Sequence, residues 1–220
     1  MSDVDKADTL ATIRARRVSA IIRTDDATLA ADAMTAAVDG GFRVVEFTLT
    51  TPAAIDLIAR FAQRDDLLVG AGTVLSPDHA RDAARAGARF LVSPVCDPDV
   101  IREAARLGVV SIPGTFTPTE MLTADRSGAD ILKVFPSPGD VAGHVRAVLG
   151  PLPHLRLFPT AGVTIDNFLD VLRAGAFGVG FVRPLFDPQD MARRNLEAIR
   201  QRAKQIFTRL ADLPAPPRQT

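Results

Sequence analysis

Two charged residues lie inside stretches that are otherwise apolar, and they are the side chains of this sequence best placed for chemistry. Lys133 interrupts the apolar run of "ILKVF", and Glu46 interrupts that of "VVEFT". A charge buried in such a strand is costly unless another group compensates for it. A desolvated lysine amine is a nucleophile, and a nearby carboxylate can act as its acid–base partner. The two residues therefore indicate either covalent chemistry through an amine or a structural ion pair that fills the interior.

The alternation of side chains along a strand predicts which way the two charges point. If both point into the molecule, the opposite face of each strand is wholly apolar. The residues expected on those outer faces are Leu132, Val134, Val45 and Phe47. At the ordinary lysine pKa of ~10.4, only about one amine in 2,500 is uncharged at pH 7, so a nucleophilic role requires burial. Ionised Glu46 in direct contact would keep Lys133 protonated, so we expect the pair to be close but bridged by water or substrate.

Helical segments that end at a glycine and lead into an apolar run recur along the chain, as in "RAGARFLVS", "RLGVVSIPG" and "RSGADILKV". Eight strands alternating with helices are predicted, at residues 18–23, 43–49, 67–73, 90–94, 109–113, 131–135, 155–160 and 177–182. Strict alternation requires parallel strands joined by crossovers. Eight units predict an α/β fold of the closed (β/α)8 TIM-barrel type, with an extra N-terminal helix. The alternative, an open doubly wound sheet, lacks a complete glycine-rich nucleotide motif.

The boundaries of the elements follow from the same patterns. One domain is expected over residues 1–220, because this length suits a single barrel. Residues 190–211 are predicted to form one long amphipathic helix, and residues 51–64 a helix that starts at the Thr51–Pro52 pair. Residues 213–220, "LPAPPRQT", are expected to be a disordered tail.

The composition restricts the class of partner. Lys and Arg number 26 and so do Asp and Glu, which argues against nucleic-acid or membrane binding driven by charge. The polar, acidic N-terminus is unlike a secretory signal, so a cytoplasmic location is expected. The single cysteine, Cys96, is expected to be inert. His79, His144 and His154 lack the spacing of metal ligands, and no metal site is predicted.

The C-terminal ends of the strands are where a (β/α)8 barrel carries its active site. The residues that fall there are Arg23, Glu46, Thr48, Gly72, Thr73, Ser93, Pro94, Pro113, Gly114, Lys133, Phe135, Thr160, Gly162 and Gly180. Lys133 and Glu46 are thus expected at one edge of the barrel, together with hydroxyl groups and glycines.

Six motifs, in order, carry a resemblance to a known family: "VVEFTLTTP", "VGAGTVLSP", "FLVSP", "IPGTFTPTEM", "LKVFP" and "PTAGVTIDNFLDVL". Between about residues 18 and 186 the chain resembles the 2-keto-3-deoxy-6-phosphogluconate (KDPG) aldolase / 4-hydroxy-2-oxoglutarate (KHG) aldolase family. The resemblance implies a homotrimer and a class I pyruvate aldolase that needs neither metal nor cofactor. It also implies a place in carbohydrate metabolism, in the Entner–Doudoroff route. Lys133 corresponds to the family's Schiff-base lysine and Glu46 to its acid–base glutamate.

The resemblance extends to residues that would hold the substrate. Thr73 corresponds to a threonine that helps bind the pyruvate carboxylate. Pro94 and Phe135 correspond to the apolar pyruvate pocket, and Gly162 to a glycine-rich loop after the seventh strand. The further substrate-binding candidates are Gly72, Thr160, Gly180, Thr50 and Arg23.

Departures from the family pattern concern the distal half of the substrate. Thr50 stands where phosphogluconate-type members often carry arginine. Phe181 and Val182 replace the second Gly and the Ser of a Gly-Gly-Ser phosphate motif, and bulk at Phe181 is expected to obstruct an anion. Ala161 stands where glycine is common in the family. Arg183 or Arg23 could compensate with charge.

The expected function is therefore cleavage of a 2-keto-4-hydroxy acid, foremost 2-keto-3-deoxy-6-phosphogluconate, to pyruvate and glyceraldehyde 3-phosphate. The alternatives within this chemistry are 4-hydroxy-2-oxoglutarate and an unphosphorylated 2-keto-3-deoxy sugar acid. Two further alternatives are a phosphate-sugar isomerase or synthase, which would form no covalent adduct, and a non-catalytic binding barrel.

Overall fold

Short buried strands, all paired in parallel, form the centre of the molecule in the computed structural model, which describes residues 3–214. They are β1 (Val18–Ile22), β2 (Val44–Thr48), β3 (Leu68–Gly72), β4 (Phe90–Val92), β5 (Val110–Ile112), β6 (Gly114–Thr115), β7 (Leu132–Val134), β8 (Leu157–Pro159) and β9 (Val179–Phe181). One sheet has the order β5-β4-β3-β2-β1-β9 and the other β6-β7-β8. The predicted parallel α/β arrangement is confirmed.

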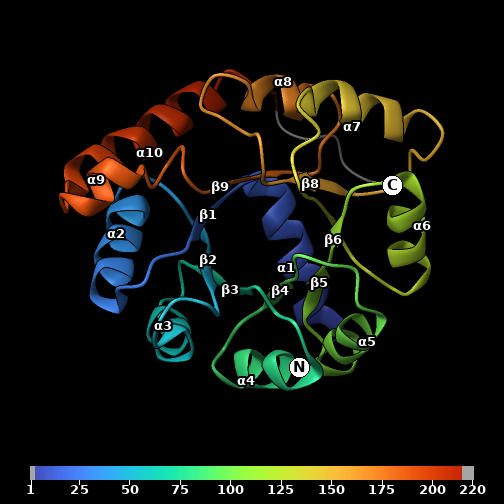
Figure 1. Ribbon diagram of the computed structural model, residues 1–220, viewed down its shortest axis with the longest axis horizontal. Coiled ribbons are helices and arrows are strands. Elements are labelled where there is room, and N and C mark those ends of the chain that lie inside the picture. Colours follow the sequence, from blue (N-terminus) through green and yellow to red (C-terminus); the bar gives the residue numbers. More distant parts are fainter. Residues whose placement is uncertain (1–2, 215–220) are drawn as a thin grey trace.

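The two sheets curl toward each other around one interior, as Figure 1 shows. The predicted strand 109–113 corresponds to β5, which ends before Pro113, and β6 follows directly after this proline, because proline has no N–H to give to a neighbouring strand. Lys133 instead donates its backbone N–H to the carbonyl of Pro113, at 2.9 Å. Next to β8 and β9, the N–H of Phe177 reaches the carbonyl of Leu157 at 2.8 Å.

Helices follow the strands and cover the outside of the sheets (Figure 1). They are α2 (Ala27–Asp39), α3 (Ala54–Phe61), α4 (Pro77–Arg85), α5 (Pro98–Leu107), α6 (Pro118–Arg126), α7 (Val141–Leu149), α8 (Phe168–Arg173), α9 (Pro188–Ala192) and α10 (Leu196–Leu210). The predicted start signals operate at three of them, where Ser76, Asp97 and Thr117 each cap a helix whose first turn contains proline.

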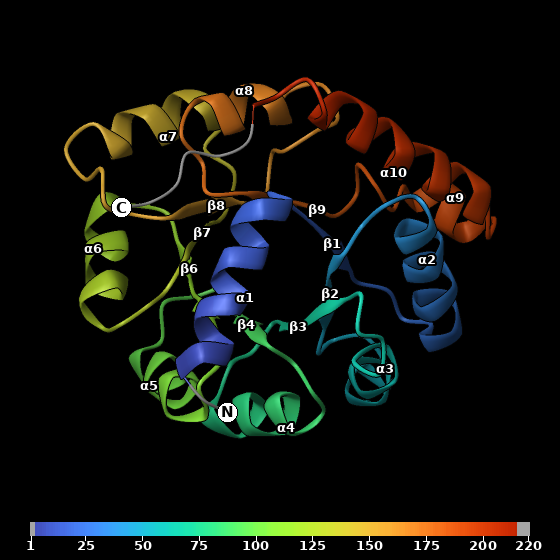
Figure 2. The same cartoon turned by 180° about the vertical axis from the view of Figure 1, so that it is seen from behind.

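The helix α1 (Asp3–Arg16) precedes β1 and lies across the N-terminal end of the strands, as Figure 2 shows from behind. Ile13 of α1 belongs to the inner cluster of apolar side chains. Lys6 forms an ion pair with Asp130, at 3.0 Å, at the start of the segment that leads into β7. Asp130 in turn accepts from the backbone N–H of Ser111 at 2.9 Å. This helix therefore closes the end of the interior opposite the strand C-termini.

The apolar side chains separate into an inner and an outer cluster. Val44 and Ile131 belong to the inner cluster, whereas Val45, Phe47 and Val134 belong to the outer one beneath the helices. Side chains alternate along a strand, so Glu46 and Lys133 point inward, as predicted.

Two predicted helix boundaries are wrong. The segment 190–211 is not one helix, because Arg194 adopts a left-handed backbone (φ 50°) and Asn195 caps a new helix by accepting from the N–H of Ala198. The helix predicted at Thr51–Pro52 starts at Ala54, since Ala53 is left-handed and the Thr51 hydroxyl is engaged elsewhere.

Two other expectations concern the chain ends and membranes. Most of the predicted disordered tail, residues 215–220, lies outside the described residues. Within residues 3–214, no helix has the length and apolarity needed to span a membrane.

Candidate active site

Lys133 and Glu46 enter the interior from different sheets. Lys133 is the middle residue of β7 and Glu46 lies in β2, and their exposed fractions are 9% and 2%. No ion pair within 4 Å joins them in the described part of the chain, yet the charge of each affects the pKa of the other. This spacing agrees with the prediction of a pair that interacts without direct contact.

Burial dominates the protonation of both groups. Desolvation raises the pKa of Glu46 to about 7, although the positive charges of Lys133 and Arg23 oppose the rise. Desolvation likewise lowers the pKa of Lys133, the charge of Glu46 opposes this, and the charge of Arg23 adds to it. An amine with a lowered pKa and a carboxyl that titrates near neutrality suit a nucleophile and a general acid–base, respectively.

Arg23 and Thr73 meet at the C-terminal ends of β1 and β3. The Arg23 guanidinium donates to the Thr73 hydroxyl at 3.2 Å. Thr73 has a left-handed backbone (φ 60°) directly after β3, an uncommon conformation for a threonine. A cation and a hydroxyl group side by side at the strand ends can bind a carboxylate of a small molecule.

Hydroxyl groups cluster at the end of β2. The Thr48 Oγ1 atom lies 3.1 Å from the Thr50 hydroxyl and 3.2 Å from the Thr51 hydroxyl. Thr51 is buried and also accepts from the backbone N–H of Thr24, at 3.4 Å. Thr50 itself is exposed and belongs to this edge of the molecule.

Phe135 adjoins the lysine on another side and shares a groove with Pro94. The Lys133 Nζ atom lies 5.0 Å from the centre of the Phe135 ring, within the range of a cation–π contact. Phe135 also lines a groove of about 520 Å³ together with Pro94, Cys96 and Phe116. Burial raises the pKa of the Cys96 thiol, which agrees with its predicted inertness.

The remaining predicted residues differ in their position. Thr160 is buried and lines a small cavity of about 10 Å³ next to Glu46. Gly162 has φ +75° and lies so close to Ser137 that a Cβ would approach its hydroxyl oxygen within 2.1 Å. Gly180 is in the middle of β9, and a Cβ there would meet the Ile21 side chain at 2.5 Å. A Cβ there would also meet the Thr160 methyl carbon at 2.9 Å, so Gly180 leaves room for the packing of interior side chains.

The expectation that Phe181 obstructs the site is wrong. Its ring is fully buried in the outer cluster, where it packs edge-on against Phe42 and Phe168 with centroid distances of 6.2 and 5.4 Å. It points away from the interior because it follows inward-facing Gly180 in the same strand.

Sequence reasoning missed Ser19 as a neighbour of the site. Ser19 is 2% exposed and lines the small cavity with Glu46 and Thr160. The available signal was a polar residue within the apolar run "VSAII" of β1. Among the described residues no group of three or more His, Cys, Asp or Glu is arranged to hold a metal ion.

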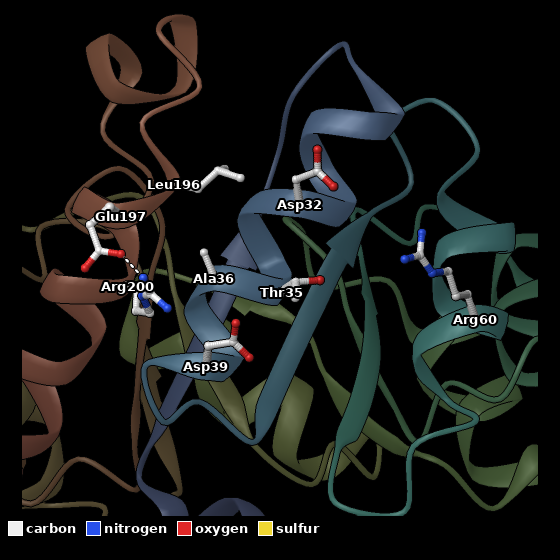
Figure 3. A pocket seen from close by; sticks show the side chains of 8 residues that line it. All are labelled: Asp32, Thr35, Ala36, Asp39, Arg60, Leu196, Glu197 and Arg200. Carbon is white, nitrogen blue, oxygen red and sulfur yellow. Dashed lines mark hydrogen bonds and ion pairs between the residues drawn. The ribbon is translucent and has the colours of Figure 1, made fainter.

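A separate groove of about 360 Å³ lies on the outer flank of the molecule, between α2, α3 and α10 (Figure 3). Its walls carry charges of both signs, among them Asp32, Asp39 and Arg60, and Glu197 is paired with Arg200. None of the predicted site residues lines this groove.

Comparison with known proteins gives consistent matches over most of the chain. The family model for KDPG and KHG aldolases matches residues 10–201. The chain is 36% identical over 154 residues to the 2-dehydro-3-deoxy-6-phosphogalactonate aldolase of Escherichia coli (strain K12), an alignment that covers 69% of this chain and 75% of that protein. It is 38% identical over 146 residues to the 2-dehydro-3-deoxy-phosphogluconate aldolase of Pseudomonas aeruginosa, which covers 64% of each.

A solved structure matches in three dimensions as well. The KDPG aldolase from Legionella pneumophila, determined with pyruvate captured as a covalent carbinolamine intermediate, superposes with a TM-score of 0.79 at 26% identity. The superposition covers 90% of this chain and 97% of that one.

Proposed function

The chain belongs to the KDPG and KHG aldolase family, and from this premise we propose that it cleaves a 2-keto-4-hydroxy acid through a Schiff base on Lys133. As a member of an aldolase family it is a carbon–carbon lyase. The observation that carries the proposal is a buried lysine with a lowered pKa, held beyond ion-pair distance from a buried glutamate that titrates near neutrality. The proposed scaffold is a complete (β/α)8 barrel.

The first half of the reaction uses the amine. Neutral Lys133 attacks the C2 carbonyl of the substrate and forms a carbinolamine, which loses water to give an iminium ion. The iminium then withdraws electrons from the C3–C4 bond. Arg23 and the Thr73 hydroxyl would hold the C1 carboxylate, because they are joined by a hydrogen bond at the strand ends next to this site.

The second half uses the carboxylate. Glu46 takes the proton of the C4 hydroxyl through a bridging water, the C3–C4 bond breaks, and the aldehyde leaves. The C3–C4 electron pair becomes the enamine double bond, the enamine takes a proton at C3, and hydrolysis releases pyruvate and free Lys133. A positioned acid–base of this kind contributes roughly 10²–10⁴-fold to a rate.

The proposed substrate is 2-keto-3-deoxy-6-phosphogluconate, with its galactonate isomer as the nearest alternative. Relatives of similar identity are named for each of the two sugar acids. Arg183 lies two residues after the end of β9 and is exposed, so its charge can serve a distal anion. Cleavage rates measured side by side for both phosphorylated acids, their unphosphorylated forms and 4-hydroxy-2-oxoglutarate would decide among these substrates.

Borohydride reduction in the presence of pyruvate tests the covalent step. The expected result is an intact-mass increase equal to one reduced pyruvate adduct, which peptide mapping assigns to Lys133. Lys133→Ala is expected to abolish the adduct. An unmodified wild-type protein would contradict the proposed function and would favour an isomerase or a binding barrel.

We propose further that the protein assembles as a homotrimer, as the family resemblance implies. Large apolar side chains are exposed at the C-terminal ends of successive strands, where a partner could cover them. They are Leu75, Val95, Phe116 and Phe135.

A further inference from the structure

We propose that Gly72 is a positioning residue, whose missing side chain leaves the space that the Glu46 carboxylate occupies. A Cβ at residue 72 would lie 2.0 Å from the Glu46 Oε1 atom and 2.9 Å from its carboxyl carbon. No heavy atoms approach so closely without bonding, so any side chain at this position must displace the carboxylate. The proposal rests on the proposed function, because it gives Gly72 a part in the acid–base step.

The backbone does not explain why glycine stands here. Gly72 is a regular residue of β3, paired with Thr48, and its φ lies outside the left-handed region that favours glycine. Gly162 differs, since its φ of +75° is itself unfavourable for other residues. An alanine could therefore adopt the backbone conformation of residue 72. The carboxylate is the main obstacle, since the next neighbour, the Thr48 methyl carbon, would lie 3.1 Å from the new Cβ.

The register of the sheet indicates where a displaced carboxylate would go. Glu46 pairs with Gly70, so Gly72 lies further toward the C-terminal end of the strands than the Glu46 backbone. A Cβ at residue 72 pushes the carboxylate back toward the N-terminal end of the interior. There the small cavity next to Glu46 is lined mainly by apolar side chains, including Val92 and Phe158. Deeper burial among apolar groups disfavours the ionised form further.

Gly70 provides a matched control two residues earlier in β3. A Cβ at residue 70 would meet the Phe90 ring at 2.3 Å, and no atom of Glu46 is among its three nearest neighbours. Gly70→Ala therefore disturbs packing inside the same barrel without acting directly on the carboxylate. A general loss of stability should affect both variants, whereas a change in Glu46 titration should be specific to Gly72→Ala.

The first experiment measures Glu46 directly by carbon-13 NMR of its labelled carboxyl in the absence of substrate, which does not depend on activity. In Gly72→Ala the midpoint is expected to move to higher pH than in wild type and Gly70→Ala. Midpoints that coincide in all three proteins would overturn the proposal. Borohydride trapping of the wild type with pyruvate tests the proposed function separately, so the two failures are distinguishable.

The second experiment measures cleavage kinetics and replaces Glu46 by the shorter aspartate. In Gly72→Ala the cleavage rate is expected to fall roughly 10–100-fold with its ascending pH limb displaced upward, while pyruvate trapping on Lys133 persists. Glu46→Asp withdraws the carboxylate by one methylene and makes room for the new Cβ. The cleavage rate of the double variant Gly72→Ala, Glu46→Asp is therefore expected to fall by a smaller factor than the product of the factors for the two single variants. If Gly72→Ala does not fold, the double variant should fold. An insoluble double variant would overturn the proposal, and so would a double variant whose loss of cleavage rate equals the product of the two single losses.

Discussion

The chemistry of single residues here depends on how two buried charges are separated from water. Glu46 has almost no exposed surface, and its pKa is raised to about 7 mainly by desolvation. Burial lowers the pKa of Lys133 at the same time. The same low-dielectric interior thus favours the neutral forms of both groups near pH 7, and a direct ion pair would reverse both effects.

Glu46 should make stability depend on pH. Its pKa in the folded protein, about 7, exceeds the ordinary value of 4.5, so the folded state binds this proton more tightly than the unfolded state. The resulting stabilisation is complete below about pH 4.5 and is lost as the pH rises through 7, by about 3 kcal/mol. Glu46→Gln is therefore expected to be more stable than wild type at pH 8, with the difference vanishing near pH 4.5.

Urea unfolding of both proteins at pH 5 and pH 8 measures this difference. Glu197→Gln, on the exposed surface of α10, is the control and should show little pH dependence of its own. A stability gain of Glu46→Gln that is equal at both pH values would contradict the raised pKa.

The two arginines at the strand ends, Arg23 and Arg183, are expected to bind different parts of the substrate. Arg23 donates a hydrogen bond to Thr73, and its charge affects the pKa of both Lys133 and Glu46. Arg23→Ala is therefore expected to weaken binding of every 2-keto acid. Loss of a charged hydrogen bond corresponds to an increase in KM of roughly 10–100-fold. Arg183→Ala is the matched variant and should raise KM for phosphorylated acids only. Equal effects of Arg23→Ala and Arg183→Ala on both substrate types would refute this division.

The elements of the fold were predictable where composition and spacing agree. Glycines such as Gly87, Gly108 and Gly128 end helices with positive φ, and the apolar runs after them form the expected strands. The α9–α10 break was not predicted, since Arg193 and Arg194 are good helix formers and tertiary contacts decide the outcome. Arg194 leaves the helix to pair with Asp26, the cap of α2, at 2.5 Å.

The site was predictable to the same extent. The inward direction of Lys133 and Glu46 follows from alternation within each strand, and the structure has both in the interior. The same alternation, applied to Gly180, would have directed the Phe181 ring outward. The space left by Gly72 could not be predicted, because it depends on the register between β2 and β3 and on the side-chain path of Glu46.

The break between α9 and α10 gives a prediction at the scale of one element. Asn195 accepts from the N–H of Ala198 and so caps α10, which packs against α2. Asn195→Ala removes that cap and is expected to lower the free energy of unfolding by about 1 kcal/mol. Cleavage kinetics should not change, because α10 is remote from Lys133. Urea unfolding gives the stability. Both Asn195→Ala and Asn195→Ser lose the hydrogen bond from the Asn195 amide to Asp190, but the serine hydroxyl can still cap, so Asn195→Ser should be the more stable of the two. Equal stability of the two variants would contradict the capping role.

At the scale of the whole molecule, the two ends of the interior differ. The helix α1 covers the N-terminal end of the strands, whereas the C-terminal end carries both the proposed site and the exposed apolar side chains. Val95, Phe116 and Phe135 are 51, 36 and 40% exposed, and all three line one groove. Apolar surface of this kind next to a polar rim is typical of a protein–protein interface.

The proposed trimer should therefore be sensitive to charge in that groove. Phe116→Asp inserts a carboxylate among the apolar side chains and is expected to convert the trimer to monomer, measured by light scattering after size-exclusion chromatography. Ile55→Asp, at an exposed apolar residue in α3 away from the groove, is the control and should leave the mass unchanged. Phe135 lies both in this groove and 5.0 Å from the Lys133 amine, yet the lysine is already buried and its pKa already lowered in the single chain. Monomeric Phe116→Asp is accordingly expected to keep trapping pyruvate on Lys133 at neutral pH, and a trimer of unchanged mass in this variant would show that the interface lies elsewhere.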